Sequence, residues 1–146
     1  APALSPTLTS ARHAAQGGIS ISLQVLLQTE AMRENGLEPV VLAQPEFAEQ
    51  YWTLTQMLTH HASNGCNLRS GDLLSSGTVS GPDRQDSGCL VESTSGGKQY
   101  RQLPSGETRV FLEDGDTVWL RGVCHREGYR PIGFGECKGQ IVKATQ

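Results

Sequence analysis

The sequence predicts a single domain that is mainly β with one helix. From Asp72 onward, short apolar runs are separated by clusters of Gly, Pro, Asp and Ser at intervals of about ten residues, which is typical of all-β folds. An alternating stretch nearer the amino terminus indicates a further strand, and one segment shows helical spacing. A length of 146 residues suits one ordinary domain.

The first elements are two strands. Residues 1–18 are rich in Ala, Pro, Ser, Thr and Gly, and are expected to form a linker or tail. Residues 19–28 then alternate apolar and polar side chains, the period of a strand with one buried face. After the turn-like residues 34–36, the valines within residues 39–42 favour a second short strand.

The third element is a helix that we expect to begin at Pro45, because proline is tolerated in a first helical turn. Four large apolar side chains follow at helical spacing and are expected to form core: Phe47, Tyr51, Leu54 and Leu58. Asn64 and Gly65 tolerate the left-handed conformation of a helix end, so we expect the helix to stop there.

The remaining elements are expected to be strands. The runs are LLSSGTVS, CLVEST, TRVFL, TVWLRGV and QIVKA. Residues 95–97 (Ser-Gly-Gly) and 105–106 (Ser-Gly) are suited to hairpin turns, so neighbouring strands should pair antiparallel as a folded roll or sandwich.

Charge and cysteine content exclude several classes of function. Lys and Arg number 12 against 15 Asp and Glu, a net charge of −3 without any block of like charge, so neither nucleic acid nor an anionic membrane is an expected partner. No apolar run approaches the roughly 20 residues that span a bilayer. The four cysteines lack C-x-x-C pairs and are expected to be reduced and mostly buried. We therefore expect a soluble, cytoplasmic protein.

Several motifs have structural explanations. His60 and His61 are adjacent, so on a helix they point about 100° apart and cannot share a metal. The glycines of residues 133–139 do not fit the dinucleotide fingerprint and are expected in turns. Residues 112–116 (LEDGD) are too short for a calcium loop and are expected to form a solvated turn. In residues 77–81 the serine comes one place too late for a nucleophile elbow.

Residues 64–92 are the part of the chain richest in side chains that could bind a ligand. The candidate binding residues in it are Asn64, Gly65, Asn67, Arg69, Thr78, Ser80 and Glu92. They could hold a small polar substrate by hydrogen bonds, or they could serve only as turn residues.

Three segments of the chain resemble the carboxy-terminal part of the fumarylacetoacetase family. They are YWTLTQMLTHHASNGCNLRSGDLLSSGTVSGP, FLEDGDTVWLRGVC and EGYRPIGFGECKGQIV, and the likeness extends over residues 19–142. Smaller members of the fumarylacetoacetate hydrolase superfamily differ where this chain reads LRSGDLLSSGTVSG. The resemblance implies that residues 19–146 are the carboxy-terminal part of a catalytic domain, a mixed β-sandwich roll.

The same resemblance implies a homodimeric, metal-dependent hydrolase that splits the carbon–carbon bond of fumarylacetoacetate, in the last step of tyrosine catabolism. Mg²⁺ or Ca²⁺ would act as Lewis acid and a histidine would activate water. Thr78 falls on the family's substrate-binding threonine. Glu92 falls on the catalytic glutamate that orients the histidine, and is expected to be buried and ionised. His60 and His61 fall on a His-His pair at the edge of the site, with packing and support as their expected roles.

The family's metal ligands and histidine base lie upstream of the part that this chain resembles, so the chain supplies no expected metal ligand. It would carry only part of an active site and be inactive alone. Three explanations stay open. The chain is a portion of a complete enzyme, a non-catalytic truncated fragment or dimerisation module, or part of a hydrolase for a related β-diketo acid.

Overall fold

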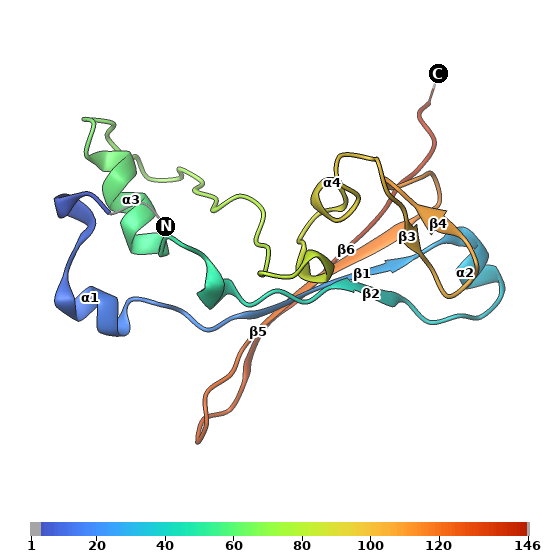
Figure 1. Ribbon diagram of the computed structural model, residues 1–146, viewed down its shortest axis with the longest axis horizontal. Coiled ribbons are helices and arrows are strands. Elements are labelled where there is room, and N and C mark those ends of the chain that lie inside the picture. The colour runs from blue at the N-terminus through green and yellow to red at the C-terminus, as the bar shows by residue number, and fades with distance from the viewer. Residues whose placement is uncertain (1–3, 146) are drawn as a thin grey trace.

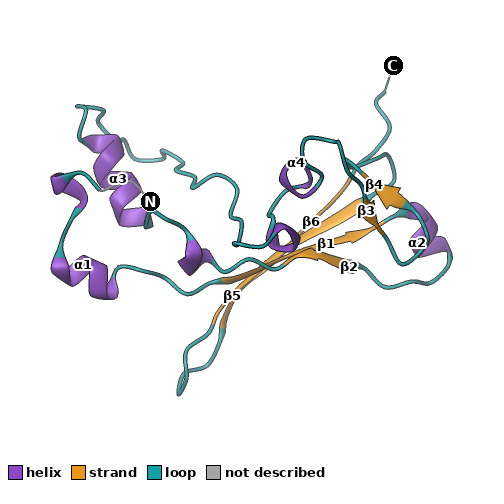
Figure 2. Cartoon of the chain, in the orientation of Figure 1, coloured by secondary structure: helices purple, strands orange, loops and turns teal. Residues whose placement is uncertain are grey.

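A computed structural model describes residues 4–145 of the chain (Figure 1). The strands form an extended sheet, and two helices, α1 (Ala11–Gln16) and α3 (Leu54–Ala62), lie together at the opposite end of the molecule. Long segments without regular structure connect the two ends (Figure 2). The fold is β-rich with short helices, which agrees with the predicted class at that level.

The main sheet has four antiparallel strands in the order β2-β1-β5-β6. Their bounds are β1 (Ser22–Gln28), β2 (Val40–Ala43), β5 (Thr117–Cys124) and β6 (Ile132–Gln140). Val25 pairs with Leu120 and Leu27 with Val118, so these apolar side chains share one face of the sheet. The predicted strands at residues 19–28, 39–42 and in TVWLRGV are confirmed with small shifts of their ends.

A short helix that the sequence patterns did not indicate, α2 (Glu30–Glu34), separates β1 from β2. Thr29 caps it, because its Oγ1 accepts a hydrogen bond from Met32 N at 3.0 Å. Met32 is fully buried together with Leu27. The helix lies at the end of the sheet and contributes a buried methionine there (Figure 1).

The predicted start of the long helix at Pro45 is wrong. Pro45 O accepts a hydrogen bond from Leu23 N at 3.0 Å, and Phe47 N donates to Ile21 O at 2.9 Å, so this segment continues the pairing with β1. A single 3-10 turn, η2 (Phe47–Glu49), follows, and α3 begins only after Thr53. In the predicted core stripe, Phe47 is buried, but the other three side chains, Tyr51, Leu54 and Leu58, are 40–49% exposed.

The run CLVEST forms a helix and not a strand. It contains α4 (Leu90–Ser93), preceded by the 3-10 turn η3 (Arg84–Asp86). Residues 95–97 all have positive φ and end α4, where Gly96 N donates to Val91 O at 2.7 Å, so they are not a hairpin turn. The run LLSSGTVS has no regular structure.

A small second sheet follows α4. Strands β3 (Arg101–Gln102) and β4 (Thr108–Arg109) pair antiparallel. Residues 105–106 lie in the turn that joins them, as predicted.

The glycines of residues 133–139 lie in β6 and not in turns, which corrects the prediction. The register shifts between Arg121 and Val123, where two residues of β6 stand opposite one of β5, and Gly135 has a φ of 80° there. Gly122 leaves room for the Phe134 ring, which would lie 3.1 Å from a Cβ at that position. The β5–β6 hairpin projects well beyond the rest of the sheet (Figure 1).

The described part of residues 1–18 contains the 3-10 turn η1 (Pro6–Leu8) and α1. Leu8 is buried, and its carbonyl accepts a hydrogen bond from Gln56 Nε2 at 3.1 Å. His13 Nε2 shares a hydrogen bond of 2.7 Å with Thr53 Oγ1. This segment therefore contacts α3, while the division of the chain at residue 18 stays a prediction.

A buried ion pair joins the turn at 112–116 to β4. Arg109 donates to both carboxylate oxygens of Asp116, from Nε at 2.9 Å and from Nη2 at 3.0 Å. Asp116 is fully buried, so only part of this turn is solvated as predicted. Arg109 also donates to Glu107 Oε1 at 3.2 Å, and the Glu107 carboxylate in turn accepts from Thr29. Charged hydrogen bonds thus tie β4 to this turn and to the start of α2.

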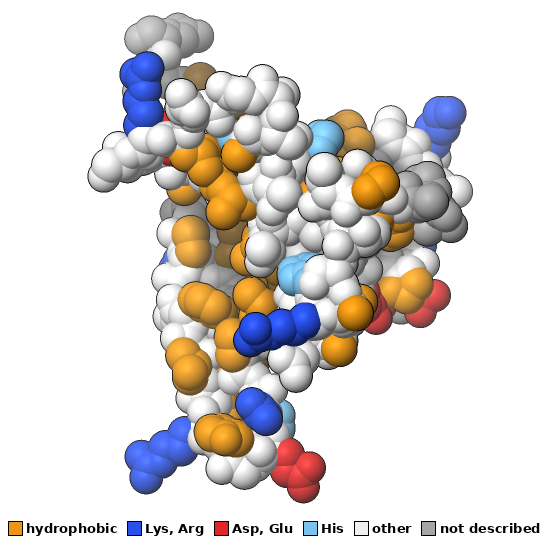
Figure 3. Space-filling model, turned by 90° about the vertical axis from the view of Figure 1, so that its left-hand side faces the viewer, with side chains coloured by type: hydrophobic (Ala, Val, Ile, Leu, Met, Phe, Trp, Pro, Cys, Tyr) orange, Lys and Arg blue, Asp and Glu red, His pale blue; other side chains and the backbone are white. Residues whose placement is uncertain are grey.

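Exposed apolar side chains are frequent, as Figure 3 shows for the α1–α3 end. Leu73 and Leu74, in the segment after α3, are 94% and 52% exposed. All four cysteines are free, as expected, but Cys66 and Cys137 are exposed and the other two half-buried, which corrects the expectation of mostly buried thiols. Among residues 4–145, no helix is long and apolar enough to cross a membrane.

Candidate functional site

The two predicted site residues lie on neighbouring segments of the chain. Thr78 belongs to the irregular segment that returns from α3 towards the sheet, and Glu92 is the third residue of α4. Both residues are exposed. Glu92 was expected to be buried, and that expectation is wrong for this chain.

Ser80 connects these two segments. Its hydroxyl donates a hydrogen bond to Glu92 Oε2 and accepts one from Gly88 N at 3.1 Å. Because the backbone N–H occupies a lone pair of the hydroxyl oxygen, the O–H is directed towards the carboxylate. One oxygen of Glu92 is therefore occupied, and Oε1 has no hydrogen-bond partner among residues 4–145.

Gly88 allows the two segments to approach closely. A Cβ at this position would lie 2.0 Å from Val79 O and 3.1 Å from Thr78 Cγ2. Two residues earlier, Asp86 O accepts a hydrogen bond from Gly81 N at 3.0 Å. The backbone of residues 78–81 thus lies directly against residues 86–88. The sequence carries no signal for this contact, because a glycine in a stretch rich in Gly, Ser, Pro and Asp looks like an ordinary turn residue.

Arg84 holds α4 in place. Its Nε and Nη2 donate to Ser93 O at 2.8 and 2.6 Å, and its Nη1 donates to Gln99. Thr94 Oγ1 adds a 2.6 Å hydrogen bond to Leu90 O. A helix of a single turn has little stability of its own, so these contacts fix the backbone that carries Glu92.

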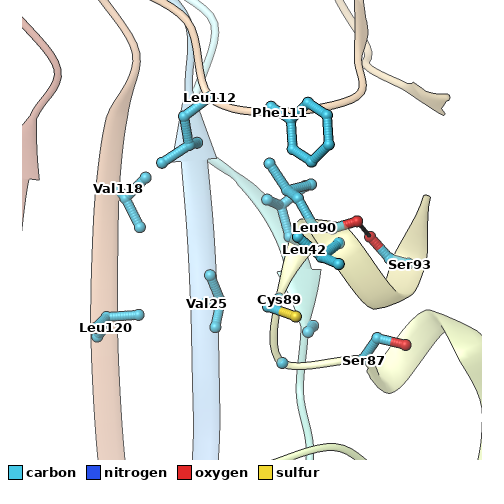
Figure 4. A pocket seen from close by; sticks show the side chains of 13 residues that line it. Val25, Leu42, Ser87, Cys89, Leu90, Ser93, Phe111, Leu112, Val118 and Leu120 are labelled. Atoms are coloured by element: carbon cyan, nitrogen blue, oxygen red, sulfur yellow. Dashed lines mark hydrogen bonds between the residues drawn. The ribbon is translucent and has the colours of Figure 1, made fainter. Parts of the chain in front are cut away.

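An apolar pocket of about 410 Å³ lies between α4 and the sheet. Cys89, just before α4, and Leu90, its first residue, line it on one side, and Val25 and Leu120 line it from the sheet (Figure 4). Neither Thr78 nor the Glu92 carboxylate lines this pocket. Its lining is mostly apolar, with Ser87 and Ser93 as hydroxyl-bearing residues and no charged side chain, so we place the candidate site at the Thr78–Ser80–Glu92 cluster, where hydroxyls and a carboxylate come together.

The histidine pair lies away from this cluster. His60 and His61 are on the last turn of α3, at the other end of the molecule from α4 (Figure 1). The His60 ring packs edge-on against Trp52, with 5.0 Å between ring centroids, and His61 lines a separate pocket beside Leu58 and Leu74. Their side chains diverge as expected.

Asn64 and the backbone of Arg69 take part in turns. Asn64 Oδ1 accepts from Cys66 N at 3.0 Å, and Arg69 N donates to Asp72 Oδ2 at 2.8 Å. Within residues 4–145, no three His, Cys, Asp or Glu side chains gather as a metal site requires. The candidate site in this chain is therefore a hydroxyl–carboxylate cluster.

Comparison with known proteins decides the family. The model of the fumarylacetoacetate (FAA) hydrolase C-terminal family matches residues 2–142. The chain belongs to this family. It is 45% identical over 124 residues to fumarylacetoacetase of Bos taurus, and 45% identical over 123 residues to that of Arabidopsis thaliana. The identity to fumarylacetoacetase of Oryza sativa is 49% over 107 residues.

This family member corresponds to a part of those relatives. The matches cover 85%, 84% and 73% of this chain, but 28%, 29% and 24% of the cattle, Arabidopsis and rice proteins. The chain thus spans a little more than a quarter of the length of the first two. The resemblance noted in the sequence is confirmed at the level of the family.

Proposed function

We propose that these residues form the carboxy-terminal part of an enzyme that hydrolyses the carbon–carbon bond of fumarylacetoacetate to fumarate and acetoacetate. Family membership and the names of the relatives support this proposal. The observation that supports roles for particular residues is the pair of hydrogen bonds made by Ser80. They hold the Thr78 segment against the helix of Glu92, while the side chains of Thr78 and Glu92 stay accessible.

In this proposal Thr78 binds substrate. Its side chain is exposed, and a hydroxyl can donate to a substrate oxygen. The backbone of Thr78 is held by Gln50, whose Nε2 donates to Thr78 O at 3.4 Å, and by the close contact with Gly88. A fixed backbone gives the hydroxyl a defined position.

Glu92 is proposed to orient a histidine base supplied by another part of the enzyme. A carboxylate that accepts a hydrogen bond from one ring nitrogen fixes the tautomer, raises the basicity of the other nitrogen and stabilises the imidazolium that forms. The Oε1 atom is the acceptor in this arrangement. The histidine then takes a proton from the attacking water.

Mg²⁺ or Ca²⁺ is proposed as the cofactor, with its ligands supplied by another part of the enzyme. The described side chains do not fit a metal site, so no step of the mechanism is assigned to them through the cation. When bound, such a cation would polarise the diketo oxygens of the substrate.

We also propose that the complete enzyme is homodimeric and cytoplasmic, and that its catalytic domain is a mixed β-sandwich roll. Strand β6 is exposed along its whole length and lies at the edge of the sheet. An unpaired edge with apolar side chains favours association, so this exposure supports a larger assembly in which β6 is covered. Leu120 and Phe134, on neighbouring strands, are 49% and 67% exposed.

Substitution of the carboxylate tests the proposal. In the complete polypeptide that contains these residues, Glu92→Gln keeps the shape of the side chain but removes its charge, so the histidine loses its orientation and its stabilising partner. We expect kcat for fumarylacetoacetate to fall by roughly 100-fold or more, with KM nearly unchanged, as for loss of an interaction made mainly in the transition state. An unchanged kcat would remove Glu92 from the mechanism.

A further inference from the structure

The Ser80 hydroxyl is the described group that restrains the Glu92 carboxylate. Glu92 is exposed on a one-turn helix, and Ser80 is its side chain's hydrogen-bond partner among residues 4–145. An exposed glutamate that is not held samples many rotamers, and fixing such a side chain costs up to about 2 kcal/mol of conformational entropy. A carboxylate that must orient a base needs this restraint before substrate binds.

The hydroxyl of Ser80 is itself oriented. Gly88 N donates to its oxygen at 3.1 Å, and Gly88 sits on the segment that leads directly into α4. The Gly88 N–H, the Ser80 hydroxyl and the Glu92 carboxylate therefore form a series of hydrogen bonds that begins and ends within residues 88–92. Arg84 fixes that segment through Ser93 O, so this series rests on a rigid backbone.

We propose that Ser80 is a positioning residue that fixes the orientation of the Glu92 carboxylate, so that its second oxygen faces the reaction. By holding Oε2, it leaves Oε1 as the acceptor for the histidine of the proposed mechanism. Ser80 touches no reacting atom in this arrangement and acts only through Glu92. The inference rests on the proposed function and extends it to a residue that links substrate binding at Thr78 with the orientation of the base.

The test compares variants of the complete polypeptide, with fumarylacetoacetate as substrate. Ser80→Ala removes the donor, and we expect kcat to fall about tenfold with KM changed less than about twofold, the effect of one lost hydrogen bond to a charged group. Ser80→Thr keeps a hydroxyl and should recover most of the loss. Ser76→Ala is the matched control, because among the described residues the Ser76 hydroxyl donates to the adjacent Gly77 O alone, and it should leave kcat unchanged.

A double-mutant cycle separates positioning from a purely structural role. If Ser80 acts through Glu92, Ser80→Ala should lower kcat less than about twofold in the Glu92→Gln background, because the carboxylate it holds is already gone. Multiplicative effects, or a Ser80→Ala enzyme as active as Ser76→Ala, would overturn the inference. Ser80→Cys, of similar shape but a weak donor, gives the same comparison should Ser80→Ala fail to fold. Absence of turnover in the unsubstituted enzyme would overturn the proposed function itself, and this inference with it.

Discussion

At the residue scale, the candidate site depends on a contact between backbones. Gly88 lies where residues 78–81 and 86–88 meet, and no side chain fits between them. The sequence indicated Thr78 and Glu92 through a family resemblance, and it placed Ser80 among the polar candidates. It could not indicate Gly88 or Arg84, because their roles arise only when irregular segments about ten residues apart fold back against each other.

Substitution of Gly88 should therefore disturb the site. A Cβ only 2.0 Å from Val79 O forces the backbone to move, so we expect Gly88→Ala to lower the free energy of unfolding by about 1–3 kcal/mol, as overpacking does. Chemical denaturation measures this change.

Gly133→Ala provides the control for this prediction. Gly133 lies in β6, and a Cβ there would meet no atom within 4 Å. Its free energy of unfolding should change by less than about 0.5 kcal/mol. Equal effects of the two substitutions would show that the close contact at Gly88 has no energetic consequence.

At the element scale, an alternating pattern predicted β1, whereas short apolar runs predicted some strands correctly, as in β2 and β5, and failed for others. Residues 19–28 alternate, and β1 forms there with neighbours on both sides. CLVEST is too short to distinguish a strand from a single helical turn by its pattern, and contacts from Arg84 and Thr94 stabilise the turn. In β6, pairing with β5 and a bulge at Gly135 overcome the low strand preference of glycine.

The start of α3 shows a signal that is present in the sequence. Thr53 and Gln56 form a capping box, in which Thr53 Oγ1 accepts from Gln56 N at 3.2 Å and Gln56 Oε1 accepts from Thr53 N at 3.0 Å. The predicted start depended instead on Pro45 as a first-turn residue, which extended the helix towards the amino terminus. In the structure the Pro45 carbonyl instead accepts a hydrogen bond from Leu23 N of β1, so Pro45 is extended alongside that strand.

At the scale of the whole molecule, charged hydrogen bonds join the start of α2, the β3–β4 turn and β4. Glu107 accepts from Thr29 before α2, from Ser105 in the β3–β4 turn and from Arg109 on β4. The hydrogen bond from Thr29 is the largest cause that lowers the pKa of Glu107, followed by that from Ser105. The carboxylate is thus stabilised in its ionised form by the folded state.

This network predicts a loss of stability in acid. Because the folded pKa of Glu107 lies below its unfolded value of about 4.3, its contribution is present above that pH and is lost as pH falls through the folded pKa. Glu107→Gln should therefore flatten the pH dependence of the unfolding free energy below about pH 4.5. Glu38→Gln, at an exposed position, should leave the curve unchanged, and coincident curves for both variants would contradict this role.

The substrate preference of the complete polypeptide tests the central claim most directly. Its kcat/KM for fumarylacetoacetate should exceed that for a shorter acylpyruvate, with fumarate and acetoacetate released in equal amounts. Preference for the shorter acylpyruvate would assign the family fold to another β-diketo acid, and no cleavage of either compound would contradict the proposed hydrolase.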